Sequence, residues 1–98
     1  MRMLFVIGHL GDYHVPRYEA LMRLATRRGD EVSMIEVFGR SGFYSFPQTR
    51  RASFFEQRHE RVTTLESDVS DAGGRWLNVF TRLTAIIRRI EPDVVVTL

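Results

Sequence analysis

The strongest constraint on this chain is the order of its hydrophobic patterns. A continuous apolar run, Met3–Ile7, is stopped by a glycine, and such runs are typical of parallel strands that are covered on both faces. Residues 14–28 then place apolar side chains at helical spacing, with Pro16 in the first turn and Gly29 just past the end. A second strand-like run covers residues 31–38. This order predicts one βαβ unit with a right-handed crossover.

The middle of the chain has no clear period. Residues 39–55 predict a long ordered loop, with one helical turn near residues 53–58. The aromatic side chains of this region are Phe43, Tyr44, Phe46, Phe54 and Phe55. The aromatic loop 43–55 matches no known motif, so its role stays open. β-Branched residues at 61–65 predict a short strand, and residues 67–74 predict a turn.

Helical periodicity returns over residues 75–90 and is followed by an apolar run at 93–98, which predicts a buried parallel strand. The expected core face of this helix comprises Trp76, Phe80, Leu83, Ile87 and Ile90. Together the elements predict the α/β class, with a partial doubly wound, Rossmann-like sheet in the order 3-2-1-4. The two helices are expected on opposite faces of the sheet or flanking the first strand. Because a buried strand normally leads into a further loop, residues 1–98 are expected to be the N-terminal part of a larger domain, truncated at the C-terminus.

Composition excludes several kinds of chemistry. The chain has no cysteine and no lysine, so thiolate metal sites, cysteine nucleophiles and Schiff-base lysines are unavailable. The three histidines lack the spacing of a metal pair, and we expect neither a metal nor another cofactor. The net charge of +2 is too small to favour nucleic acid. No apolar run is long enough to cross a membrane, which favours the cytoplasm; peripheral membrane contact stays open.

The segment between the first strand and the first helix is the candidate binding site. Its candidate residues are Gly8, His9, Gly11, Asp12, Tyr13 and His14. Backbone N–H groups beside a helix N-terminus suit a phosphate or another anion, and glycines let a ligand approach the backbone closely. The alternative is that Gly8 and Gly11 only form a tight turn. Asp12 could cap the helix or bind a sugar hydroxyl, and His14 could exchange a proton or donate a hydrogen bond.

Two further features concern nucleotide cofactors. The glycine spacing is G-x-x-G rather than G-x-G-x-x-G, which disfavours a nucleotide-cofactor oxidoreductase. Glu36 near the end of the second strand occupies the place of a ribose-binding acid, although this feature alone is a weak signal.

Several motifs occur in a familiar order: Met1–Gly11, His14–Val15, Leu24–Val32 and Pro92–Val96. This order resembles the N-terminal domain of retaining glycosyltransferases of the family-four type, which have the GT-B fold. Asp30 stands where that family commonly has histidine, and the family's double glycine is split here. The resemblance implies the acceptor-side portion of an enzyme that moves a sugar from a nucleotide diphosphate sugar to an acceptor hydroxyl, with retention.

The implied partners are the nucleotide diphosphate sugar, the acceptor and a missing C-terminal domain. No catalytic residue carries over, so the fragment alone is expected to be inactive. The loop around Gly11, together with His14, carries over as donor-phosphate or acceptor contacts. The alternative is a small flavodoxin-like or Rossmann-like ligand-binding or regulatory domain with no catalysis of its own. A response regulator is disfavoured, because Gly8 and His9 follow the first strand where that family has acidic residues.

Overall fold

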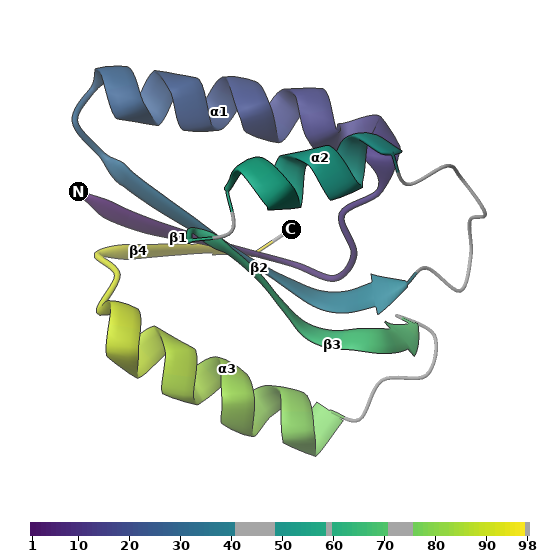
Figure 1. Ribbon diagram of the computed structural model, residues 1–98. Helices are drawn as coiled ribbons and strands as arrows, with labels where there is room; N and C mark the ends of the chain where they lie inside the picture. The colour runs from purple at the N-terminus through teal and green to yellow at the C-terminus, as the bar shows by residue number, and fades with distance from the viewer. Residues whose placement is uncertain (41–48, 59, 71–75, 98) are drawn as a thin grey trace.

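The computed structural model describes residues 1–40, 49–58, 60–70 and 76–97. In chain order the elements are β1 (Arg2–Ile7), the 3-10 turn η1 (Asp12–His14), α1 (Val15–Arg27), β2 (Glu31–Arg40), α2 (Thr49–Gln57), β3 (Val62–Ser70), α3 (Trp76–Ile90) and β4 (Val94–Thr97). The strands form a parallel sheet in the order β3-β2-β1-β4. Helices α1 and α2 cover one face and α3 the other (Figure 1). The α/β class, the Rossmann-like topology and the strand order are therefore confirmed.

The core consists of two layers that share the sheet. Along β1, Phe5 and Ile7 point into the layer under α1 and α2, whereas Leu4 and Val6 point into the layer over α3. Alternate residues face opposite sides of a strand, so both sides must be apolar when both are covered. This explains the unbroken apolar run at the start of the sequence.

Helix α1 ends as its sequence predicts. Gly29 has a φ of 76°, its N–H donates to the Thr26 carbonyl at 3.2 Å, and the Asp30 N–H donates to the Ala25 carbonyl at 2.9 Å. These two bonds form a Schellman motif, in which the left-handed residue is usually glycine because a Cβ is disfavoured there.

The expected loop at 39–55 is wrong in its second half, because Thr49–Gln57 form α2. The helix places Phe54, 1% exposed, in the core beneath α1. Guanidinium groups lie over aromatic rings four residues away: Arg51 is 4.6 Å from the Phe55 ring centroid and Arg58 is 4.7 Å from that of Phe54. This spacing is the helical one. The aromatic residues at 43–46 lie outside the described residues.

Strand β3 is longer than predicted. It begins at Val62 as expected but continues to Ser70, where the sequence indicated a turn from residue 67. Its pairing with β2 is irregular between Phe38 and Arg40. The remainder of the expected turn, residues 71–74, lies outside the described residues.

Helix α3 is present, and its predicted core face is confirmed at Leu83, Ile87 and Ile90 but wrong at its beginning. Val79 is its buried side chain, and Leu83, Ile86, Ile87 and Ile90 pack partly against the sheet. Trp76 and Phe80 are 68% and 69% exposed, so their assignment to the core is wrong. The apolar side chains that face the sheet begin at Val79, the residue before Phe80. Trp76 keeps an edge-on contact with Phe38, at 5.7 Å between ring centroids.

Strand β4 is parallel, as predicted, but it is not buried. It pairs with β1 on one side and forms the outer edge of the sheet on the other, so three of its four residues are exposed. A strand needs two neighbours and two covered faces to be buried, and among the described strands β4 has one neighbour. In the described ranges no helix is both long and apolar enough to span a membrane.

Candidate functional site

The predicted site lies at the carboxyl end of β1, where the strand order changes direction. Strands β2 and β3 follow one another on one side of β1, and β4 lies on its other side. Ligands of open α/β sheets bind outside the carboxyl ends of the strands at such a switch point. The connection from β1 to α1 crosses this place, and the Gly8 carbonyl accepts the Phe38 N–H at 2.7 Å, which ties the connection to β2.

The two glycines of this connection have open space beside them. A Cβ at Gly8 would meet nothing within 4 Å, and one at Gly11 would meet only the His14 ring carbon Cδ2 at 3.9 Å. Gly11 has a φ of −68° and a ψ of 146°, an extended conformation that any residue adopts. Neither packing nor a positive φ therefore requires glycine at these positions, which weakens the alternative that they serve only to form a tight turn.

A buried carboxylate organises the floor of the site. Glu36 on β2 is 0% exposed, and its oxygens accept hydrogen bonds from protein donors. The Leu10 N–H donates at 2.7 Å, the Thr64 hydroxyl at 2.9 Å and the Arg51 Nε at 3.0 Å; Arg51 Nη2 is a fourth donor. Glu36 therefore joins the β1 connection, β3 and α2. The expectation of a ribose-binding acid is wrong, because protein donors occupy the carboxylate.

His9 and Asp12 also serve to hold these elements together. His9 Nδ1 lies 2.9 Å from the Phe38 carbonyl oxygen and 3.4 Å from Glu36 Oε2, with its side chain 7% exposed. The Asp12 carboxylate accepts the backbone N–H of Arg51 at 2.6 Å. Asp12 therefore caps the first turn of α2. The sequence had suggested a cap on the first helix, but the 3-10 turn before α1 has no side-chain cap.

Tyr13 and His14 are the side chains of the site that face solvent. Tyr13 is 73% exposed, and its ring meets the His14 ring edge-on with 5.3 Å between centroids. Two exposed rings with polar atoms beside open glycines suit a ligand that offers hydroxyl or anionic groups. The structure thus divides the six predicted residues: Gly8, Gly11, Tyr13 and His14 form the open surface, while His9 and Asp12 bind the protein itself.

Sequence reasoning missed Arg51 and Thr64 as parts of the site. Arg51 lies in a segment expected to be a loop, and it is 15 residues from Glu36 along the chain, whereas Thr64 is 28 residues away. The four-residue spacing from Arg51 to Phe55 could have revealed the helix, but no sequence pattern pairs Arg51 with Glu36. Within the described ranges no three His, Asp or Glu side chains gather as a metal-binding group.

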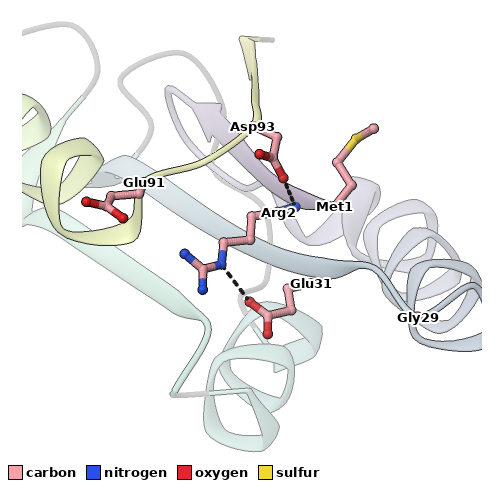
Figure 2. Close-up of a pocket in the computed structure, with 6 residues that line it drawn as sticks. All are labelled: Met1, Arg2, Gly29, Glu31, Glu91 and Asp93. Carbon is pink, nitrogen blue, oxygen red and sulfur yellow. Dashed lines mark hydrogen bonds and ion pairs between the residues drawn. The ribbon is translucent and has the colours of Figure 1, made fainter.

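A hollow lies at the opposite, amino-terminal edge of the sheet. It has a volume of about 310 Å³ and is lined by Met1, Arg2, Gly29, Glu31, Glu91 and Asp93. Figure 2 shows Arg2 between two carboxylates: its Nε lies 3.5 Å from Glu31, and its backbone N–H donates to Asp93 at 2.7 Å. Arg2 is paired with Glu31, and Asp93 already accepts a backbone N–H. The carboxyl-terminal edge, where the strand order changes direction, therefore remains the candidate site.

Comparison with known proteins identifies fold relatives of this chain. No protein-family model matches the sequence, and no curated protein matches it. Two solved structures match. One is a deacetylase triple mutant from the teicoplanin biosynthetic pathway, with 25% identity and a TM-score of 0.62, covering 99% of this chain and 50% of that chain. The other is a deacetylase–bog complex of the same pathway, with 23% identity, a TM-score of 0.61, and coverage of 99% and 54%.

These matches overturn the expected glycosyltransferase. The structures that this chain resembles are deacetylases rather than GT-B enzymes, so the nucleotide diphosphate sugar and the sugar acceptor are wrong as partners. The motifs that suggested them describe a strand, a glycine-containing connection, a helix and a later strand. Parallel α/β proteins of different activities share these elements, so their order indicates the fold and not the reaction. The chain spans about half the length of the structures that it matches.

Proposed function

We propose that this chain is a Rossmann-like ligand-binding domain with no catalysis of its own, and that the segment Gly8–His14 binds a small hydroxylated or anionic ligand. The observation that carries the proposal is the open space at Gly8 and Gly11, at the carboxyl end of β1. A Cβ would fit at both positions, so its absence leaves room for a ligand against the backbone.

The buried carboxylate of Glu36 is unsuited to act as a general base. Glu36 has four protein donors on its oxygens, and it could take a proton from a ligand only after its ion pair with Arg51 had opened. A general base must reach the proton that it abstracts, within about 3 Å or through one water. Glu36 instead fixes the shape of the floor under the ligand.

The comparisons favour a second candidate, an acetylated ligand. The structure that is 25% identical to this chain is a deacetylase, an enzyme that removes acetyl groups. In this alternative residues 1–98 are one part of a longer deacetylase-like protein.

We also propose a cytoplasmic location, supported by the place of Met3–Ile7 in the middle of the sheet, where these apolar residues have a structural role.

Titration of the isotope-labelled chain, followed by amide NMR, tests the binding proposal. The probes are inorganic phosphate, glucosamine and N-acetylglucosamine. We expect shifts concentrated in residues 8–14, with affinity in the millimolar range, because a few hydrogen bonds of about 1 kcal/mol each must offset the entropy lost on binding. A response to N-acetylglucosamine alone favours the acetylated ligand.

The matched variants are Gly11→Val and, as a control on the far side of the protein, Thr81→Val. Valine suits the extended backbone of Gly11, and a Cβ there meets only the His14 ring, so we expect the thermal midpoint to be unchanged while the shifts of residues 8–14 are lost. Thr81→Val should bind as the parent does. Shifts that persist in Gly11→Val would show that the open glycines are not the ligand site.

A further inference from the structure

The contacts of the buried His9 ring determine which of its nitrogens carries a proton. Its Nδ1 lies 2.9 Å from the Phe38 carbonyl oxygen and 3.4 Å from Glu36 Oε2. A carbonyl oxygen can only accept a hydrogen bond, and so can the Glu36 carboxylate, which is paired with Arg51. Nδ1 therefore carries the proton, because a bare lone pair would face two acceptors. In the neutral ring the other nitrogen, Nε2, is then a hydrogen-bond acceptor.

His9 Nε2 has no donor from the described part of the protein. It is also not enclosed, whereas Arg58 Nη1 is buried and has no hydrogen-bond partner there. The His9 side chain as a whole is 7% exposed. An acceptor that is largely removed from water is costly unless a donor reaches it. The ring therefore offers one acceptor, held in place through Nδ1, to a ligand at the segment Gly8–His14.

We propose that the ligand of this segment is a neutral hydroxyl donor, such as a sugar ring, and that His9 Nε2 accepts one of its hydroxyl hydrogens. The inference rests on the proposed ligand-binding function and narrows its ligand class, which includes anions. A hydroxyl group has a hydrogen to donate. A fully ionised anion has acceptor atoms alone, and these would meet the lone pair of Nε2.

Backbone donors of the connection from β1 to α1 are already in use. Anion sites at helix N-termini depend on N–H groups that are free to point at the ligand. Three such groups donate within the protein instead. They belong to Leu10, His14 and Val15, and their acceptors are oxygens of Glu36, Gly11 and Asp12. An anion would have to compete with these bonds, whereas a hydroxyl needs only the acceptor on His9.

The side chains bonded around this connection carry more negative than positive charge. Asp12 and Glu36 supply two carboxylates, and the guanidinium of Arg51 offsets one of them. Because Glu36 is fully buried, salt screens its charge less than that of an exposed group. An anion would meet the excess negative charge, whereas a neutral ligand would not. The electrostatics and the His9 ring therefore favour the same class of ligand.

The protonation of the His9 ring provides the first test, and it needs no ligand. Two-bond proton–nitrogen correlation spectra of the isotope-labelled chain at alkaline pH distinguish a protonated imidazole nitrogen from a bare one. We expect the proton of His9 on Nδ1. A proton on Nε2 would overturn this inference, because that nitrogen would then be a donor, and it would leave the binding proposal as it stands.

Titration with neutral and anionic probes, followed by amide NMR, tests the ligand class. The probes are glucose, N-acetylglucosamine and sulfate, which has no hydrogen to donate. We expect shifts in residues 8–14 with at least one of the sugars, and none with sulfate at the same concentration and ionic strength. A response to sulfate that equals or exceeds the response to the sugars would overturn this inference, while the segment would remain a binding site. No response to any probe would overturn the binding proposal as well.

The variant His9→Asn separates the roles of the two ring nitrogens. The amide nitrogen of asparagine can replace Nδ1 as the donor to the Phe38 carbonyl, while nothing replaces Nε2. We expect sugar affinity to fall about fivefold, as for one lost hydrogen bond, with the amide spectrum outside residues 8–14 preserved. Thr81→Asn introduces the same residue on the exposed side of α3 and should bind as the parent does. Unchanged affinity in a folded His9→Asn would contradict the role of Nε2, and the ring spectra and the probes decide if that variant does not fold.

Discussion

Glu36 shows how one residue can hold several elements. Its side chain is fully buried and receives donors from the β1 connection, from α2 and from β3. A buried charge is costly unless it is paired and hydrogen-bonded, and here Arg51 supplies both the charge and two of the donors. The consequence is that α2 is fastened to the sheet beside the candidate ligand site.

Removing the partner of this charge should therefore be costly. Arg51→Ala is expected to lower the free energy of unfolding by about 3 kcal/mol, measured by urea denaturation, because it leaves Glu36 buried without its counter-charge. Arg50→Ala removes the same charge from an exposed neighbouring position and should change stability by less than about 0.5 kcal/mol. The double variant Glu36→Leu with Arg51→Leu should lose less than Arg51→Ala does. Equal costs at positions 50 and 51 would contradict this account.

Two residues in the described part of the chain have a positive φ, Gly29 at 76° and Glu91 at 51°. Both follow the last turn of a helix, and both line the hollow of Figure 2. A side chain in the left-handed conformation costs roughly 1 kcal/mol, because its Cβ crowds the following carbonyl. Glycine avoids this cost at position 29, whereas Glu91 carries it.

Exchanging the residue types at these positions should have opposite effects. Glu91→Gly is expected to raise the free energy of unfolding by up to about 1 kcal/mol, and Gly29→Ala to lower it by about the same amount. Thermal unfolding of both variants at one protein concentration measures the two changes. Destabilisation by Glu91→Gly would mean that contacts of the Glu91 side chain outweigh the strain.

At the scale of elements, α3 shows that a regular apolar pattern does not by itself determine which face of a helix is buried. Val79 is buried at 4% exposure, whereas Leu77 two residues earlier is 82% exposed. Both belong to an apolar stretch with helical spacing. The two side chains point to nearly opposite sides of the helix, and only the side that carries Val79 faces the sheet.

A pair of truncations checks the orientation of α3. Val79→Ala should lower the free energy of unfolding by roughly 1–3 kcal/mol, since it removes buried methyl groups from the layer over β1 and β2. Leu77→Ala should be close to neutral, although it removes a larger side chain. The measurement is again urea denaturation, and a larger loss for Leu77→Ala would mean that the helix is rotated about its axis relative to this structure.

At the scale of the whole molecule, the chain is a three-layer α/β unit with one face of its sheet under α1 and α2 and the other under α3 (Figure 1). Structures twice its length superpose on 99% of it. These are deacetylases, and the sequence motifs pointed to glycosyltransferases. The motifs and the structural matches concern the same arrangement of strands and helices, which proteins of different activities share.

The sequence by itself determined the elements whose signals are local. The apolar runs predicted three strands that begin within two residues of their observed starts, and the helical spacing predicted α1 and α3. The glycine at position 29 predicted a helix end, because the left-handed conformation is a property of the residue itself. The parallel order 3-2-1-4 also followed, since right-handed crossovers leave few alternatives.

Only the tertiary structure decided which residues meet. Glu36, Arg51 and Thr64 come from three elements, and their contact depends on strand pairing and on where α2 packs. Periodicity identifies an apolar stripe on α3, but the rotation of the helix about its axis decides which of these side chains are buried. Exposure of β4 depends on whether a neighbour covers its outer edge. These properties arise between segments distant in the chain, and a local pattern carries no information about them.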